Sequence, residues 1–353
     1  MKILINALSG IGDALMFSPS LKLLKEKIPG SRIDMLVMFK SVKEMYETNP
    51  HLDNVYLIRF MNQSKLKSFK EIRNLKMNEY DFSINVYPSN RIEYNLVNAF
   101  LGAKKKISHH YLHTNFFRAE FLNDILVDEV KDRHNVLQNA DIVKRIVPIN
   151  DEEVGRMELF TENSHDESAA DWINKNNTDN RLLIGFHAGS ALLKNHIHKR
   201  WDKRKFAELG KILIEKYNVR ILLFGNEAEL NNEIKNLIGE NAILASTENF
   251  MDSVTRMKHC RLFISNDTAF LHCAAALQLP VVGIFAYTNY KELYPWKTEH
   301  IIVRKELDCS PCFYNSPKPA ACIFTGYESF KCMKTIEIHE VLDAINTLLN
   351  KSN

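Results

Sequence analysis

Residues 265–272 read Ser-Asn-Asp-Thr-Ala-Phe-Leu-His and stand between an apolar strand pattern and an Ala-rich helical pattern at 273–277. Capping-type side chains at a strand-to-helix switch leave the first N–H groups of the helix facing outward, where the helix dipole favours an anion. Thr268 and His272 would share one helix face. The segment predicts a phosphate-type pocket. The alternative is that Asp267 is a plain N-cap and His272 a packed histidine.

A second segment of this kind, Phe-His-Ala-Gly-Ser at 186–190, follows an apolar strand pattern that begins at Leu182. A turn of small residues lets a ligand approach the backbone, and a cation such as Lys199 in the basic run that follows can neutralise a polyphosphate. The run precedes a helical pattern at 202–217, which is where open α/β sheets bind ligands. A solvated basic face is the alternative.

The amino terminus carries a third motif, a strand at 2–8 that runs into Ser-Gly-Ile-Gly-Asp. A dinucleotide fingerprint would need a third glycine where Leu15 stands and an acidic residue after the second strand, where the chain reads Met-Leu-Val-Met. The Rossmann cofactor interpretation therefore fails. What remains is a glycine turn presenting Asp13, which is either a helix cap or, at the mouth of a sheet, a general base.

Four of the six cysteines stand in a Pro-rich segment at 309–332, spaced Cys-x2-Cys-x9-Cys-x9-Cys. The segment has no apolar core of its own, so cross-linking would order it. In a cytoplasmic protein, four thiolates at this spacing favour a structural Zn or Fe site over disulfides, with reduced thiols as the third alternative. The candidate ligands are Cys309, Cys312, Cys322 and Cys332.

The chain has 353 residues, 45% of them hydrophobic, which is enough for two domains of ordinary size. The formal charge of +3 is too small and too dispersed to argue for nucleic acid. Short apolar runs alternate with helical patterns, which favours parallel sheets. We place a linker at 147–165. Strands are expected at 2–8, 33–39, 55–60, 82–86, 105–108, 221–224, 242–244, 262–264 and 281–285, and helices at 42–48, 65–75 and 94–101.

No window approaches ~18 uninterrupted apolar residues, and the first residues form a strand pattern rather than a signal peptide. We therefore expect a cytoplasmic protein. Peripheral contact with a membrane, at the inner face of the inner membrane, stays open.

Taken together, the motifs resemble glycosyltransferase family 9, the ADP-heptose:lipopolysaccharide heptosyltransferases. The resemblance covers nearly the whole chain, in the family's order. Two departures are Ala269, where the family has glycine, and Asp202, where it has proline. The matching segments are 10–13, 187–190, 199–201, 206–209, 224–227, 265–272, 274–277 and 280–285.

The resemblance implies an α/β fold of GT-B architecture, in which two Rossmann-like domains with parallel sheets face each other across a cleft. It implies an acceptor-binding domain at 1–160 and a nucleotide-sugar-binding domain at 161–335 that includes the Cys-rich loop, followed by a C-terminal helix at 336–353. Catalysis by inversion would need no cofactor, which leaves the Zn or Fe at the four cysteines as a structural element only.

The resemblance also implies roles for individual residues. Asp13 would be the catalytic base, and Gly12 and Arg91 would contact the acceptor. Lys199 would neutralise the diphosphate, Glu227 would bind the ribose, and Asn249 and Phe250 would flank the adenine. The alternatives are a solvated helix start for Glu227 and a core aromatic for Phe250. The expected donor contacts are Ser190, Lys199, Glu227, Asn249, Phe250, Asp267, Thr268 and His272.

The expected activity is transfer of heptose from ADP-heptose onto a lipopolysaccharide core saccharide. The alternatives are a heptosyltransferase that acts on a protein, a non-catalytic nucleotide-sugar-binding protein of the same fold, and, more weakly supported, a nucleotide-sugar epimerase. The expected partners are a nucleotide sugar and a saccharide acceptor on a lipid or a protein.

Overall fold

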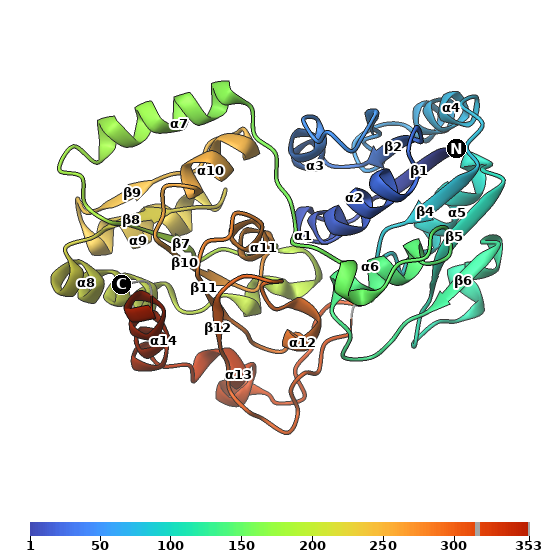
Figure 1. Cartoon of the computed structure of the whole chain (residues 1–353). Coiled ribbons are helices and arrows are strands. Elements are labelled where there is room, and N and C mark those ends of the chain that lie inside the picture. Colours follow the sequence, from blue (N-terminus) through green and yellow to red (C-terminus); the bar gives the residue numbers. More distant parts are fainter. Residues whose placement is uncertain (315–317, 352–353) are drawn as a thin grey trace. The chain divides into compact units, whose positions relative to one another are not determined.

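The computed structural model describes residues 1–314 and 318–351, which divide into two compact units (Figure 1). Unit 1 spans Met1–Phe160, and unit 2 spans 161–314 and 318–351. Each unit is built on a six-stranded sheet in which every strand pairs in parallel with its neighbours. Strands and helices alternate along both units, as the sequence predicts.

In unit 1 the first strand lies inside the sheet, so that the strand order is β3-β2-β1-β4-β5-β6. The strands are β1 (Lys2–Ala7), β2 (Arg32–Val37), β3 (Asn54–Leu57), β4 (Phe82–Asn85), β5 (Lys105–His110) and β6 (Ile125–Asp128). The helices are α1 (Ile11–Leu15), α2 (Ser18–Lys27), α3 (Lys40–Tyr46), α4 (Lys65–Lys76), α5 (Ile92–Leu101) and α6 (Asn135–Val143), with short turns η1 (Phe116–Arg118), η2 (Glu120–Leu122) and η3 (Asp151–Glu153).

Unit 2 repeats the same topology in the order β12-β11-β10-β7-β8-β9. Its strands are β7 (Leu183–His187), β8 (Arg220–Leu223), β9 (Ala242–Leu244), β10 (Leu262–Asn266), β11 (Val281–Ile284) and β12 (His300–Val303). Its helices are α7 (Asn163–Asn176), α8 (Lys203–Tyr217), α9 (Ala228–Ile238), α10 (Phe250–Met257), α11 (Ala269–Ala276), α12 (Tyr290–Leu293), α13 (Lys331–Lys334) and α14 (Ile338–Lys351), with short turns η4 (Leu193–Lys199) and η5 (Gly326–Glu328).

The central strands are almost wholly apolar because both faces of each sheet are covered. In β1, for example, every residue after Lys2 is buried. Parallel crossovers are right-handed, so the helices on the two sides of each reversal in strand order lie on opposite faces of the sheet. Helix α8 shows how the sequence fixes such a helix: Asp202 accepts a hydrogen bond from the N–H of Arg204 at 2.7 Å. Phe206, Leu209 and Leu213 then form its buried face.

Several expected boundaries shift in the structure. The helix expected at 273–277 begins at Ala269, and β10 continues to Asn266. Its N-cap is therefore Thr268, with extended backbone, and not the Ser-Asn-Asp triplet. Strands β6 and β12, each of four residues at a sheet edge, were not predicted.

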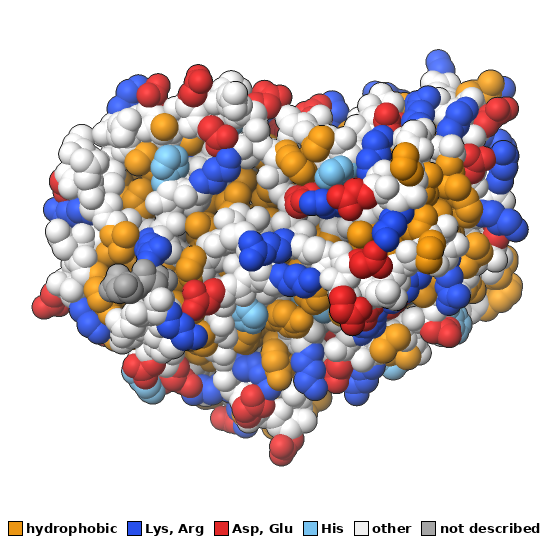
Figure 2. Space-filling model, in the orientation of Figure 1, with side chains coloured by type: hydrophobic (Ala, Val, Ile, Leu, Met, Phe, Trp, Pro, Cys, Tyr) orange, Lys and Arg blue, Asp and Glu red, His pale blue; other side chains and the backbone are white. Residues whose placement is uncertain are grey.

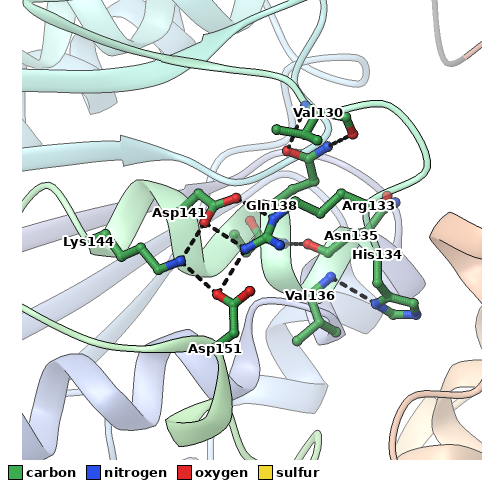
Figure 3. Close-up of polar contacts among 10 residues, drawn as sticks. Val130, Arg133, His134, Asn135, Val136, Gln138, Asp141, Lys144 and Asp151 are labelled. Carbon is green, nitrogen blue, oxygen red and sulfur yellow. Dashed lines mark hydrogen bonds and ion pairs between the residues drawn. The ribbon is translucent and has the colours of Figure 1, made fainter.

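An ion network fixes helix α6 in unit 1 (Figure 3). Arg133 donates two hydrogen bonds to Asp141 at 2.5 and 2.8 Å, and Lys144 bonds to both Asp141 and Asp151. Hydrogen bonds from Arg133 and Lys144 lower the pKa of Asp151 to about 2, so the network stays charged. The network thus anchors the segment between β6 and α6 that reaches the end of β4.

Candidate active site

The candidate donor site lies in unit 2 at the carboxyl ends of β7, β8 and β10. The strand order reverses between β7 and β10, since the chain leaves β7 toward β8 on one side and later returns to β10 on the other. Loops diverge at such a reversal and leave room for a ligand. In unit 1 the same reversal falls between β1 and β4.

A buried ion pair stands at the centre of the unit 2 site. The Lys199 Nζ lies 2.9 Å from the Asp267 Oδ2, with side-chain exposures of only 13% and 4%. The Thr288 hydroxyl donates to the same carboxylate oxygen at 2.8 Å. Burial alone would raise the pKa of Asp267, but the charge and hydrogen bonds of Lys199 and Thr288 outweigh it and lower that pKa. Asp267 is therefore an anion that holds the Lys199 ammonium in place.

Two further charged side chains, Glu227 and Arg200, meet beside this pair. The Thr268 Oγ1 lies 2.9 Å from the His187 Nδ1, and the His187 Nε2 lies 3.8 Å from a Glu227 carboxylate oxygen. Arg200 approaches the other oxygen of Glu227 at 3.7 Å. Burial raises the pKa of Glu227, and His187 and Arg200 together lower it below its ordinary value. The carboxylate is thus an anionic acceptor at the end of β8.

Two glycines make room for that carboxylate. A Cβ on Gly189 would lie 2.3 Å from the Glu227 carboxylate, and one on Gly225 would lie 2.5 Å from it. Gly225 also has a φ of +108°, which disfavours any other residue. The small residues of the turn after β7 therefore leave space for the Glu227 side chain as well as for any ligand.

The segment between β7 and α8 is fastened by the predicted donor residue Ser190 and by Arg200 and Asn266, which were not among the predicted site residues. Arg200 donates to the Ser190 carbonyl at 2.7 Å, and the Ser190 hydroxyl donates to the His196 carbonyl at 2.8 Å. Asn266, the last residue of β10, donates to the Ala188 carbonyl at 2.8 Å. The signal that could have found Asn266 is its place as a polar residue that ends a buried strand.

His272 lies buried in α11, one turn after Thr268. Burial lowers its pKa to about 4, so the ring is neutral near neutral pH. Its Nδ1 has no hydrogen-bond partner in the described part of the chain. The ring lies close enough to Asp267 and Lys199 for their charges to act on it, and a contact with the donor stays a prediction.

The two residues expected at the adenine have structural roles in this chain. Asn249 accepts the N–H of Met251 at 2.8 Å and so caps α10. Phe250 is buried, with its ring 5.7 Å from that of Phe270, which in turn lies 4.6 Å from the His187 ring. Phe250 is thus joined to the site through Phe270, and adenine contact by either residue stays a prediction.

The candidate acceptor residues lie at the reversal in unit 1. The Ser9 hydroxyl donates to the Pro88 carbonyl at 2.9 Å and so joins the segments after β1 and β4. Asp13 is half-buried on α1, next to the buried Gly12. Burial raises the pKa of Tyr94, the charge of Arg91 opposes this and the charge of Asp13 adds to it. The three side chains therefore lie within electrostatic range of one another.

The four loop cysteines line one small pocket of unit 2 without forming a metal site. Cys332 is buried and Cys312 exposed, and all four thiols are free. Burial, with nearby thiols adding to it, raises the pKa of Cys332 to about 11. Among residues 1–314 and 318–351, no group of three or more Cys, His, Asp or Glu is arranged to hold an ion. The described residues therefore show no formed ligand set for the expected Zn or Fe, and a metal at the four cysteines stays a prediction.

Two Rossmann-like units, one with a paired and largely buried cation at its strand reversal, form the architecture of GT-B glycosyltransferases. The family model for glycosyltransferase family 9 (heptosyltransferase) matches residues 68–321. The chain belongs to this family. The predicted fold class and enzyme class are thereby confirmed. In the described part of the chain, no helix is long and apolar enough to cross a bilayer.

Individual relatives agree with the family match. Lipooligosaccharide heptosyltransferase 2 of Campylobacter jejuni is 24% identical over the full length of both chains. A glycosyltransferase family 9 structure from Veillonella parvula superposes with a TM-score of 0.81 at 19% identity, covering 99% of this chain and 97% of that one. ADP-heptose lipopolysaccharide heptosyltransferase II of E. coli gives a TM-score of 0.74 at 20% identity, covering 100% and 99%.

Proposed function

We propose that this protein transfers heptose from ADP-heptose to a saccharide of the lipopolysaccharide core. The observation that carries the proposal is the Lys199 ammonium, held by the buried Asp267 at the strand reversal of unit 2. A fixed cation at such a place suits a diphosphate leaving group. The names of the relatives supply the sugar and the acceptor.

In this proposal unit 2 holds the donor. Lys199 faces the diphosphate, with Ser190, Thr268, His272 and the N–H groups that open α11 beside it. Asp267 acts through Lys199 rather than on the phosphate, because two anions in contact would repel. The Glu227 carboxylate accepts hydrogen bonds from ribose hydroxyls. Asn249 and Phe250 flank the adenine.

Unit 1 supplies the acceptor side and the base. Arg91 and Gly12 contact the acceptor saccharide, and Asp13 takes the proton of its attacking hydroxyl. The acceptor oxygen forms a bond to the anomeric carbon as the bond from that carbon to the diphosphate oxygen breaks. ADP leaves with the electron pair, and Lys199 stabilises the developing charge. This single displacement inverts the anomeric centre and calls for no catalytic cofactor.

The test pairs binding with turnover. Melting temperature is measured with ADP-heptose, ADP-glucose and UDP-glucose, since a donor stabilises the native state by mass action. Transfer is then measured to lipid A carrying inner-core sugars, and to a protein acceptor. We expect stabilisation by ADP-heptose and transfer to the lipid-linked saccharide. Tight ADP binding without any transfer would favour the non-catalytic alternative, and transfer only to protein would overturn the proposed acceptor.

We also propose that the four loop cysteines bind one structural Zn or Fe ion after deprotonation. The support is their shared pocket, beside Tyr287 and Phe330, together with their spacing. Purified protein should carry about one equivalent of metal, and Cys309→Ser should lower metal content and melting temperature with ADP affinity unchanged. Cys260→Ser, a buried thiol outside the loop, is the control. Metal-free protein whose melting the Cys309→Ser change leaves unaltered would contradict the proposal.

We further propose a cytoplasmic location with peripheral contact at the inner face of the inner membrane. A lipid-linked acceptor requires the enzyme to work at that surface. Fractionation of cells should place the protein in the cytosol and in a membrane fraction that salt releases. Protein that resists salt extraction would contradict the peripheral attachment.

A further inference from the structure

Helix α4 of unit 1 presents apolar and basic side chains on the same exposed face. Ser68, Ile72 and Leu75 are buried beneath it. On the opposite side Leu66 is 84% and Met77, just past the helix, 77% exposed. The helix carries five basic residues and one acidic residue, and its basic side chains take part in no ion pair within the described residues. Five cations are thus left for an external partner.

Helix α5 continues this apolar surface. Ile92, Leu96 and Phe100 recur every fourth residue and are all exposed, so they form a stripe along the helix. The rings of Phe69 on α4 and Phe100 on α5 meet edge to face at 6.0 Å. The two helices therefore share one apolar surface.

The short turns after β5 add three exposed aromatic rings. Phe116 is 77% and Phe117 80% exposed, and the ring of Phe116 stacks on that of Phe121 at 5.2 Å. The turn is fastened to α5, because Asn95 donates to the Arg118 carbonyl at 2.8 Å. On the right-hand side of Figure 2, hydrophobic side chains gather over this part of unit 1, with Lys and Arg among them.

A hollow of about 920 Å³ lies between α4 and the end of α5. It is lined by apolar side chains such as Phe69 and Phe100, by the cations Arg73 and Lys76, and by the carboxylates of Glu79 and Asp81, of which Asp81 is paired with Lys104. Isolated exposed apolar residues are ordinary, but a continuous patch edged with unpaired cations marks an interaction surface.

We propose that this surface, formed by α4, α5 and the turns η1 and η2, docks on a bilayer of anionic phospholipids. Aromatic rings insert at the headgroup boundary while the α4 cations meet lipid phosphates. The unpaired positive charge favours this occupant over a second copy of the chain, which would bring the same cations together. The inference rests on the proposed function: the stripe on α5 begins at Ile92, next to Arg91, so docking would hold a lipid-linked saccharide near the acceptor residues.

The test measures binding of the whole protein to vesicles, which needs neither donor nor acceptor. The vesicles are pure phosphatidylcholine, or phosphatidylcholine with about one-third phosphatidylglycerol. We expect binding to the anionic vesicles that salt weakens. The double variant Lys70→Glu/Arg73→Glu should reduce it at least about tenfold, and Phe116→Ser/Phe117→Ser by a similar factor.

Matched controls come from unit 2. Lys175→Glu/Lys211→Glu changes the same charge, and Leu182→Ser/Leu237→Ser removes exposed apolar side chains; both should bind vesicles like the unaltered protein. Calorimetric ADP binding should stay unchanged in all four variants, which shows that they fold.

Equal vesicle binding by patch and control variants would overturn the proposal. So would a dimer in sedimentation that the patch substitutions dissolve, because the surface would then bind a second copy. Vesicle binding without sugar transfer would instead count against the proposed function alone, so the two failures are distinguishable.

Discussion

Units 1 and 2 share one strand order but place their polar residues differently. In unit 2 the reversal holds charged groups in fixed pairs, with Lys199 bound to a buried Asp267. In unit 1 the interior beneath the reversal holds a buried network of asparagine amides, and the nearby Asp13 is only half-buried. The network joins Asn6 to Asn98 at 2.9 Å, Asn98 to Asn123 at 2.7 Å and Asn123 to Asn95 at 2.9 Å.

The difference shows how one topology serves two kinds of chemistry. These neutral amides bond to one another, except for the Asn6 Oδ1, which has no partner among the described residues. They hold α5 on the sheet without placing a charge there, and the half-buried Asp13 is then the carboxylate available to accept a proton. The paired charges of unit 2 instead form a rigid, preorganised cation site. Substitutions in each unit can test this contrast between a proton-accepting unit and an anion-binding unit.

The largest expected effect is on turnover. Asp13→Asn should lower sugar transfer by about 10² to 10⁴, the range typical for loss of a positioned general base. ADP affinity, measured by calorimetry, should hardly change, because the proposed donor contacts lie in unit 2. Asp128→Asn, at an exposed strand end of unit 1, is the control. Full turnover in Asp13→Asn would reduce Asp13 to a structural residue of α1.

Breaking the buried pair of unit 2 should affect both stability and donor binding. Lys199→Ala leaves Asp267 as an uncompensated buried charge, which costs about 3 to 5 kcal/mol in the free energy of unfolding. It should also weaken ADP binding by roughly 1.5 to 3 kcal/mol. Lys203→Ala breaks a partly exposed pair with Glu233 and should change stability by under about 1 kcal/mol. If the two variants behave alike, the pair is not the centre of an anion site.

Buried histidines should make unit 2 acid-sensitive. The pKa of His272 is lowered to about 4 against 6.5 in the unfolded chain, so between these values the unfolded state binds more protons. Its free energy of unfolding should therefore fall as pH drops from 6.5 toward 4, by about 1.4 kcal/mol per pH unit for this histidine. The lowered pKa of Asp267 changes the free energy of unfolding only below pH 3.8, its ordinary pKa, which lies outside the range from pH 6.5 to 4.

The measurement uses tryptophan fluorescence, because Trp172, Trp201 and Trp296 all lie in unit 2. His272→Gln should flatten the pH dependence of unfolding, and the exposed His339→Gln should leave it as it is. A slope that His272→Gln does not alter would show that the ring is already protonated in the folded state.

The smallest expected effect concerns the turn after β7. Gly189→Ala should displace the Glu227 carboxylate, lower stability by about 1 to 3 kcal/mol and weaken ADP binding. The second change in Gly189→Ala/Glu227→Ala should restore stability without restoring ADP binding. Gly155→Ala, where a Cβ meets no atom within 4 Å, is the neutral control. Failure of the double variant to recover would mean that the turn resists alanine for another reason.

Sequence reasoning succeeded where information is local. Apolar runs predicted most strands correctly. The small or polar residues at the ends of β1, β7 and β10 mark places for chemistry, and that part stays a prediction. It was wrong where local signals compete. The helix that was expected to begin at 273 begins at Ala269. The capping-type residues Ser265 and Asn266 belong to strand β10, and Asp267 lies in the loop that follows. Asn266 and Thr288 were missed because their roles depend on partners in the segments that follow other strands.

The sequence by itself determined the alternation of elements, the glycine turns and the family, because periodicity and motif spacing record local backbone preference and burial. Only the tertiary structure decided which of these motifs meet. Lys199 and Asp267 are 68 positions apart, and they pair because the strand order places β10 beside β7. Tertiary structure likewise brings the Glu227 carboxylate next to Gly189 and the ring of Phe69 into contact with that of Phe100. Such contacts depend on the order of strands and helices in space, which no local pattern encodes.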